Sequence, residues 1–363
     1  MKKFEKPIIL KEGAYSQADL EALKKEYRIW NEHDIYNLQL AEYFEITHPE
    51  SLELPEYNKK LKEYIKEHAT SGQLEGDCVY FPWNGLLVHM ISAKKYFTLR
   101  TNRNRNLITL EEQALLRESC IGIVGLSVGS NVATSLAYCG IGNIFKLAEF
   151  DTLETTNLNR IRARVDQIGM KKIDLTAQQV YEVDPFIEIV RFDGGLSKEI
   201  LDDFMNRDPK PQVVFEIIDS FELKIHLRLL AKKFRIPIIM VTNLGDRVLM
   251  DVERYDLNSD IQFFNGRAGH VPEDILQHPD TTNTDKHKYA VDLAGISHIP
   301  ARAMKSVAQI GKTLTGRPQL ASTVTIAGGF SAYFTKRILL GQELPSGSWL
   351  VDLEKLFTLE NNL

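Results

Sequence analysis

The stretch CIGIVGLSVGSNVATSLAYCGIGNIFKLAEFDTLETTNLNRI, residues 120–161, decides the fold. Residues 121–124 form a short continuous apolar run, as expected of a strand covered on both faces of a parallel sheet. A loop, a helix over about residues 130–138 and a second strand over residues 144–148 follow. This order predicts an α/β fold with a Rossmann-like, doubly wound and mostly parallel sheet, which binds a nucleotide where its strands end.

The loop between the first strand and the helix carries the glycines that a phosphate site needs. Gly125 and Gly129 allow a sharp turn and a close approach to a ligand, and the start of the helix offers free amide groups to phosphate. Glu149 lies about 20 residues later, where a Rossmann unit places the carboxylate that binds the ribose. Because the loop lacks the full G-x-G-x-x-G pattern, the glycines alone fit a structural turn equally well.

The sequence that follows resembles one nucleotide-binding family. Residues 151–160, DTLETTNLNR, resemble the D-x-x-x-x-x-N-L-x-R stretch of the ThiF/MoeB/HesA family of adenylating enzymes, which are related to ubiquitin activators. Residues 169–172 resemble its G-x-x-K, and residues 213–219 resemble the strand that delivers its Mg-binding Asp. Residues 100–116 resemble its N-terminal R-x-x-R and Q-x-x-L segments. More narrowly, GLSVG, DVERYD and RPQLAS resemble the ThiF domain that some bacterial proteins carry beside a nitroreductase-like domain, for which no room remains here.

This resemblance implies a ThiF-type adenylation domain in which a carboxylate attacks the α-phosphate of ATP and expels pyrophosphate. Such a transfer depends on positioning and charge neutralisation. The implied ATP-binding residues are Gly125, Ser127, Gly129, Glu149, Asp151, Asn157, Arg160 and Lys172. Glu149 would hold the ribose hydroxyls, and Asn157, Arg160 and Lys172 would contact phosphates. Asp219 would bind Mg²⁺, a hard cation that suits one or two carboxylates plus phosphate oxygens.

The implied catalytic groups are Arg160, Lys172, Asp219 and an N-terminal arginine. In relatives an arginine reaches across a homodimer interface into the neighbouring site, and either Arg103 or Arg105 would do so here. The carboxylate substrate implied by the family is the C-terminus of a ubiquitin-like or sulfur-carrier protein or peptide, a small metabolite, or a modified tRNA base.

Other interpretations of the same residues stay open. Arg160 and Lys172 could be solvated surface charges, and Asp219 could cap the next helix, with Ser220 as the competing cap. An NAD-dependent Rossmann oxidoreductase would need a catalytic His or a Lys and Tyr pair, which is not found. A degenerate family member that senses a nucleotide without turnover would fit the shortened glycine loop and the Ser220 that replaces an Asn.

Composition narrows the class of protein. The chain has 363 residues, of which 44% are hydrophobic, enough for one large α/β domain and an appendage. A net charge of −5 and a pI near 6.0 argue against general nucleic-acid binding, although a tRNA substrate stays open. No signal peptide or membrane span is expected, so a cytoplasmic enzyme is the prediction.

The three cysteines, Cys78, Cys120 and Cys139, form no C-x-x-C pair. The structural zinc of many relatives is therefore not expected, and no residue suits the thioester cysteine of ubiquitin activators.

The sequence pattern changes at about residue 100, which predicts a domain boundary there. Residues 1–100 predict an N-terminal extension of helices and a β-hairpin around Asn84-Gly85. Residues 101–363 predict the adenylation domain, with a flexible loop at about 266–292. Within that domain, residues 242–247 follow a buried strand and should border the pocket.

Overall fold

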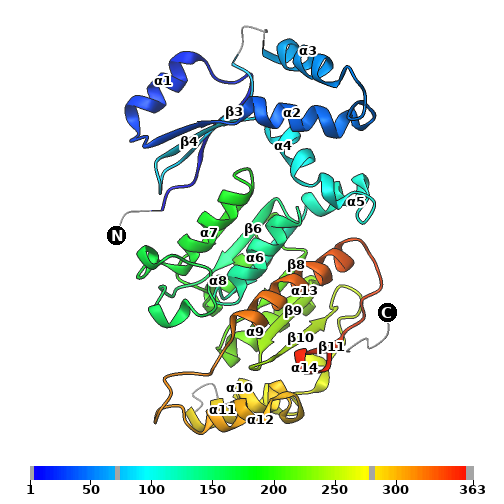
Figure 1. Cartoon of the computed structure of the whole chain (residues 1–363). Coiled ribbons are helices and arrows are strands. Elements are labelled where there is room, and N and C mark those ends of the chain that lie inside the picture. The colour runs from blue at the N-terminus through cyan, green and yellow to red at the C-terminus, as the bar shows by residue number, and fades with distance from the viewer. Residues whose placement is uncertain (1–3, 70–73, 278–282, 357–363) are drawn as a thin grey trace. The chain divides into compact units, whose positions relative to one another are not determined.

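The protein folds as two compact units, which divide between Leu110 and Glu111. The structure is a computed structural model and describes residues 4–69, 74–277 and 283–356 (Figure 1). Each unit has its own β-sheet, one of four strands and one of seven. None of the helices in the described part of the chain is both long and apolar enough to cross a membrane.

The first unit contains the predicted hairpin. Strands β3 and β4 pair antiparallel around the turn that contains Gly85, whose φ is 63°. The sheet order is β1-β3-β4-β2, and β2 pairs parallel to β4. The strands and helices are β1 (Ile8–Leu10), α1 (Gln17–Glu26), β2 (Asn31–Asp34), α2 (Tyr36–Thr47), α3 (Tyr57–Ala69), β3 (Asp77–Phe81), β4 (Leu86–Met90) and α4 (Ala93–Arg100). Helix α5 (Leu110–Arg117) begins at the last residue of this unit and otherwise belongs to the second unit.

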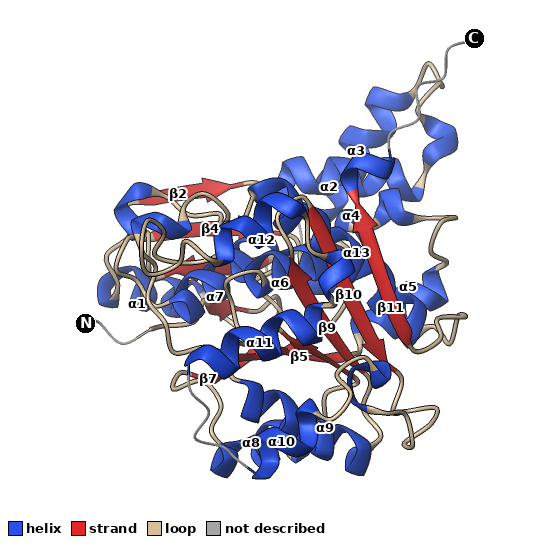
Figure 2. Ribbon diagram, turned by 90° about the horizontal axis from the view of Figure 1, so that it is seen from below, coloured by secondary structure: helices blue, strands red, loops and turns tan. Residues whose placement is uncertain are grey.

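The second unit confirms the predicted doubly wound sheet. Its strand order is β11-β10-β9-β8-β5-β6-β7, in which the strands from β9 to β7 are all parallel. Strands β10 and β11 extend the sheet antiparallel at the β9 edge (Figure 2). The strands are β5 (Cys120–Val124), β6 (Ile144–Ala148), β7 (Glu188–Phe192), β8 (Val213–Glu216), β9 (Ile238–Asn243), β10 (Arg247–Glu253) and β11 (Gly347–Asp352).

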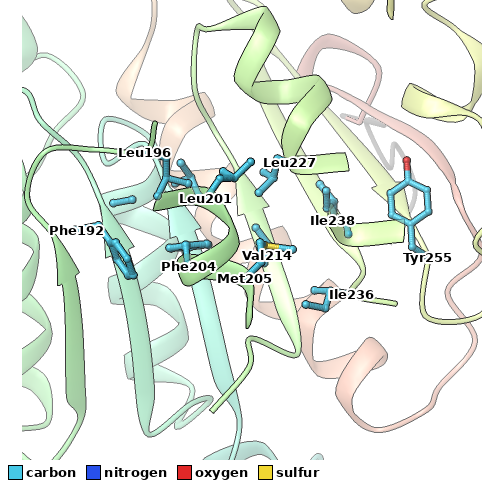
Figure 3. Close-up of a cluster of buried hydrophobic side chains, with 13 residues drawn as sticks. Phe192, Leu196, Leu201, Phe204, Met205, Val214, Leu227, Ile236, Ile238 and Tyr255 are labelled. Atoms are coloured by element: carbon cyan, nitrogen blue, oxygen red, sulfur yellow. The ribbon is translucent and has the colours of Figure 1, made fainter. Parts of the chain in front are cut away.

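Helices cover both faces of this sheet. Val124 and Val214 face α8 and α9, where Phe204 and Leu227 join one buried apolar cluster (Figure 3). Ile123 points to the opposite face, against which α6 packs with α7 and α13. The helices are α6 (Gly129–Tyr138), α7 (Lys172–Val183), α8 (Lys198–Asn206), α9 (Phe221–Phe234), α10 (Val271–Gln277), α11 (Asn283–Ala294), α12 (Ala301–Val307), α13 (Ala321–Leu339) and α14 (Leu353–Leu356).

The stretch 266–292 was expected to be a loop, but α10 and α11 occupy most of its described part. Residues 278–282 lie outside the described residues. Val271 and Ile275 of α10 and Leu293 of α11 are buried in a cluster with Phe264 and Met240. These few apolar anchors stabilise helices whose polar composition, taken alone, predicts a loop. Helices α10, α11 and α12 lie together at one end of the unit (Figure 1).

Helix α13 packs closely on α6, and two adjacent glycines of α13 allow a matched pair of substitutions that tests this packing. A Cβ at Gly328 would lie 2.7 Å from Ser135 Oγ and 2.8 Å from the Asn131 carbonyl oxygen, whereas a Cβ at Gly329 would have no neighbour within 4 Å. We expect Gly329→Ala to raise the free energy of unfolding by about 0.5–1 kcal/mol, because alanine favours a helix. Gly328→Ala should lower it by about 1–3 kcal/mol, because the two helices must separate. Urea denaturation of both variants measures the difference, and equal stability would contradict this packing.

Candidate functional site

A cavity of about 660 Å³ lies at the carboxyl ends of the parallel strands in the second unit. Its lining comes from β9, from the segments that follow β5, β6, β8 and β9, and from residues 290–319. Strand β5 has β6 on one side and β8 on the other, so the chain connections diverge between β5 and β8. Doubly wound folds bind ligands at this position, because the diverging loops leave a crevice.

The cavity brings together residues that are far apart in the sequence. Six predicted site residues line it: Ser127, Asp151, Asn157, Arg160, Lys172 and Asp219. Of the other predicted residues, Gly125, Gly129 and Glu149 lie close by in the chain but are not among its described lining residues. Arg103 and Arg105 are exposed residues of the first unit.

The glycine loop passes directly against the end of β8. Gly125 has a φ of 89°, and a Cβ there would lie only 2.1 Å from the carbonyl oxygen of Ile217. Helix α6 starts at Gly129, and no side chain caps its amino end. The amide groups at this end therefore remain suited to an anion in the adjoining cavity.

Glu149 shapes the loops around the cavity. Its Oε2 accepts a hydrogen bond from the Leu126 amide at 2.8 Å, and its Oε1 accepts from the amides of Phe150 at 2.9 Å and Asp151 at 3.0 Å. The carboxylate thus fixes the glycine loop and the segment after β6 to one another. Its predicted contact with a ribose stays a prediction.

Lys172 and Asp151 form an ion pair in the cavity wall. The Lys172 Nζ lies 2.8 Å from Asp151 Oδ2, and the Lys172 side chain is only 9% exposed. The Lys172 amide also donates to the Asp151 carbonyl at 2.9 Å. Lys172 is therefore not a solvated surface charge, and its ammonium group has a fixed position.

Asn157 and Arg160 lie in the turn after Asp151. Asn157 Oδ1 accepts a hydrogen bond from the Glu154 amide at 3.1 Å, which holds the turn. The Arg160 guanidinium donates to the Thr156 carbonyl at 3.1 Å and to Asn159 Oδ1 at 2.8 Å. No carboxylate forms an ion pair with it in the part of the chain that the structure describes, so its charge is available to an anion. Burial lowers the pKa of Arg160, and Glu154 offsets part of this effect.

Asp219 lies just beyond the end of β8 and points its carboxylate outward. The side chain is 92% exposed, and its Oδ1 lies 2.7 Å from an Nη of Arg317. Ser220 is the N-cap of α9, because its hydroxyl accepts the Leu223 amide at 3.4 Å. Asp219 therefore does not serve as the cap of α9.

A buried network of charges adjoins the cavity. Lys224 lines the cavity and lies 2.5 Å from Glu216 at the end of β8. Arg228 is fully buried and pairs with Glu216 at 3.0 Å and with Glu253 of β10 at 2.8 Å. Burial disfavours the Glu216 carboxylate, but Lys224 and Arg228 outweigh this effect and hold its pKa below the usual range. The network thus ties α9, β8 and β10 together.

Several polar atoms in the wall are buried without a hydrogen-bond partner among the described residues. They are Ser127 Oγ, Arg160 Nε, Gln319 Oε1, and both Nδ2 and Oδ1 of Asn243. Buried polar groups in folded proteins are nearly always paired with protein, water or ligand atoms, so such a set at one cavity suits water or a polar ligand. This observation fits a nucleotide.

Part of the lining was not predicted. Residues 242–245 border the cavity as expected from the sequence. Arg317 and Gln319 lie in the RPQLAS stretch noted in the sequence, but they were not assigned to the site because they follow Asp219 by about a hundred residues. The apolar residues of α11 were missed with that helix. In the described ranges no three His, Cys, Asp or Glu side chains are grouped to hold a metal ion by themselves. Any metal here would depend on Asp219 and on ligand oxygens.

Comparison with known proteins agrees with the resemblance seen in the sequence. Residues 101–356 match the model of the ThiF family. The chain is 35% identical over 274 residues to the protein MT1398 of Mycobacterium tuberculosis (strain CDC 1551 / Oshkosh), an alignment that covers 76% of this chain and 37% of that protein. It is 34% identical over 104 residues to ubiquitin-like modifier-activating enzyme 5 of Arabidopsis thaliana, covering 28% and 23% of the two chains.

A further curated relative is the tRNA threonylcarbamoyladenosine dehydratase of Bacillus subtilis (strain 168), with 28% identity over 158 residues, 43% of this chain and 60% of the other. The chain therefore spans less than two thirds of each of these three relatives. The solved structure of TcdA (CsdL) superimposes with a TM-score of 0.50 and 18% identity, covering 69% of this chain and 98% of that one. This likeness concerns the fold.

The buried network predicts a large effect of one arginine. Arg228→Met should lower the free energy of unfolding by about 3–5 kcal/mol, because Glu216 and Glu253 would remain buried without their shared partner. Arg164→Met, which breaks an exposed ion pair with Asp166, should change it by less than about 1 kcal/mol. Chemical denaturation monitored by circular dichroism compares the two variants. If Arg228→Met were as stable as Arg164→Met, the network would not hold these elements together.

Proposed function

The chain belongs to the ThiF family, and from this membership and the geometry of the cavity we propose that it is an ATP-dependent enzyme that adenylates a carboxylate. In this reaction a substrate carboxylate oxygen attacks the α-phosphorus of ATP. The bond between the α-phosphorus and the bridging oxygen breaks, pyrophosphate leaves with that oxygen, and an acyl-adenylate forms. The substrate classes named for the curated relatives, ubiquitin-like modifiers and tRNA, are candidates here.

One observation chiefly supports this proposal. Six residues that the sequence predicted as site residues come from four separate segments of the chain. They line a single cavity at the point where the sheet connections diverge. Four basic side chains stand in the described lining, namely Arg160, Lys172, Lys224 and Arg317. Transfer of an adenylyl group needs cations around the phosphates more than it needs a nucleophile from the protein.

Each residue has a role that its position allows. Lys172 and Arg160 would bind phosphate oxygens, and Ser127 with the amino end of α6 would bind the same groups through neutral donors. Asp151 keeps Lys172 oriented. Glu149 would act as a positioning residue that holds the loops in shape.

The residues also fit a magnesium ion bound with the nucleotide. Mg²⁺ is commonly held by one or two carboxylates together with substrate phosphates, and Asp219 presents an exposed carboxylate at the cavity. When bound there, Mg²⁺ would neutralise phosphate charge. Arg317 would exchange its contact with Asp219 for one with the ligand.

Two family features complete the proposal. We propose a homodimer in which Arg103 or Arg105 of one protomer reaches the site of the other; both side chains are exposed. A cytoplasmic location is part of the same prediction.

Removal of the buried lysine tests the nucleotide site. Lys172→Ala should weaken binding of α,β-methylene-ATP with Mg²⁺ by roughly 10- to 150-fold, the loss expected for a charge-assisted hydrogen bond of about 1.5–3 kcal/mol. Lys171→Ala changes the neighbouring lysine, which does not line the described cavity, and should bind as the unaltered protein does. Isothermal titration calorimetry measures both. Equal weakening in the two variants would contradict the role of Lys172, and selective binding of NADH would contradict the adenylation proposal.

Removal of the exposed carboxylate tests the metal. In the unaltered protein, affinity for α,β-methylene-ATP should rise when Mg²⁺ replaces EDTA, and Asp219→Ala should abolish this gain and any ATP–pyrophosphate exchange while the circular dichroism spectrum stays unchanged. Asp166→Ala, which also removes a partner of an arginine, serves as the control. A gain from Mg²⁺ that survives in Asp219→Ala would exclude Asp219 as the metal ligand.

A further inference from the structure

Arg317 differs from the other basic residues of the described cavity lining in where it comes from and in what holds it. It lies between α12 and α13, in residues 315–319, and Thr315, Pro318 and Gln319 of the same segment also line the cavity. Its side chain is 49% exposed, and its Nη2 lies 2.7 Å from Asp219 Oδ1. The segment thus brings a cation to the one carboxylate assigned above to the metal.

The backbone beside Arg317 is anchored. Asn159 Nδ2 donates to the Gln319 carbonyl at 2.8 Å, and Asn159 Oδ1 accepts from the Arg160 guanidinium at 2.8 Å. Pro318 adds a ring that fixes φ in the same segment. The long side chain of Arg317 can therefore change its partner by rotation about its own bonds, while the backbone and Arg160 stay in place.

The pair between Asp219 and Arg317 is the most exposed of the ion pairs in the described lining. Lys172 and Lys224 are both buried, and their carboxylate partners hold them in the wall. An exposed ion pair contributes little free energy and is readily exchanged, whereas a buried one is not. A ligand can therefore separate Asp219 from Arg317 and leave the other pairs intact.

A guanidinium on Asp219 opposes a metal that arrives alone. Mg²⁺ would have to displace a group of like charge from the same carboxylate oxygen. The metal would also find no cluster of further acidic or imidazole ligands among the described residues. Since Mg²⁺ is usually held by one or two carboxylates together with substrate phosphates, the empty cavity offers it only a weak site.

A bound nucleotide reverses this balance. The triphosphate supplies oxygens that complete the coordination of the metal, so that Asp219 is worth more to Mg²⁺ than before. The same oxygens attract the guanidinium that the metal displaces, because arginine forms strong, charge-assisted hydrogen bonds with phosphate. One cation therefore replaces another on Asp219, and neither is left without a partner.

We propose that Arg317 makes metal binding depend on the nucleotide. In the empty cavity it blocks Asp219 from divalent cations, and when Mg²⁺ arrives with ATP it moves to a phosphate oxygen while the metal takes the carboxylate. This inference rests on the proposed function and adds a means of regulation to the same site. It requires that removal of Arg317 has opposite effects on the metal alone and on the metal with nucleotide.

The substitution Arg317→Met in the full-length chain tests this requirement. Binding of Mn²⁺ alone, followed by the electron paramagnetic resonance signal of the free ion, should become about 2- to 5-fold tighter, because an exposed competing cation is gone. Binding of α,β-methylene-ATP with Mg²⁺, followed by isothermal titration calorimetry, should become roughly tenfold or more weaker. Asp219→Ala gives the background of Mn²⁺ binding, and adding Arg317→Met to it should change that background no further.

Two further variants serve as controls. Arg317→Lys keeps a cation on the segment, so it should return the Mn²⁺ affinity close to that of the unaltered protein and restore part of the nucleotide affinity. Arg164→Met removes an exposed arginine that is paired with Asp166 outside the described lining, and it should alter neither affinity. Circular dichroism confirms that each variant is folded.

The possible failures are distinct. If the unaltered protein does not bind α,β-methylene-ATP with Mg²⁺, the proposed function fails. If it binds, but Arg317→Met weakens both ligands, leaves both unchanged or alters only one of them, the exchange by Arg317 is overturned and the nucleotide site stands. Tight binding of Mn²⁺ alone to the unaltered protein, lost in Asp219→Ala, would overturn it as well.

Discussion

The close contact between the glycine loop and the end of β8 is the constraint on which the site depends. At Gly125 the chain leaves β5 so near the Ile217 carbonyl that no side chain fits between them. The segments after β5 and β8 therefore stay together at the sheet while the chain beyond them departs to opposite sides. A cavity opens above this contact, and one set of amide groups and cations faces it from both directions.

Three of the four basic side chains in the described lining of the cavity are paired with a carboxylate. Lys172 is held by Asp151, Arg317 by Asp219, and Lys224 by Glu216. Of these pairs, the one with Glu216 is buried and joins the Arg228 network, whereas the one with Asp219 is exposed and breaks at little cost. The cavity thus adjoins a rigid, buried network of charges and an exposed ion pair that a ligand can separate.

The sequence predicted the elements of residues 120–161 to within one or two residues, because a buried strand, a glycine turn and an apolar helix each leave a local pattern. Lys172 and Asp219 were found through the spacing of a family motif. Arg317 was not, since its contact with Asp219 spans 98 positions and no periodicity encodes it. The helices of 271–294 were missed because tertiary contacts of a few apolar residues, rather than propensity, stabilise them.

The antiparallel addition of β10 and β11 has a consequence for evolution. The predicted ATP-binding residues come from β5, β6 and the loops that follow them, whereas apolar lining residues such as Leu244 and Ile299 come from the end of β9 onward. Arg247, which holds the His298 carbonyl, is paired with Asp352 at the far edge of the sheet. Mutations in α11 and α12 can therefore change the apolar lining of the cavity while the predicted ATP-binding residues stay in place. In such an arrangement one wall of the cavity can diversify while the opposite wall is inherited unchanged.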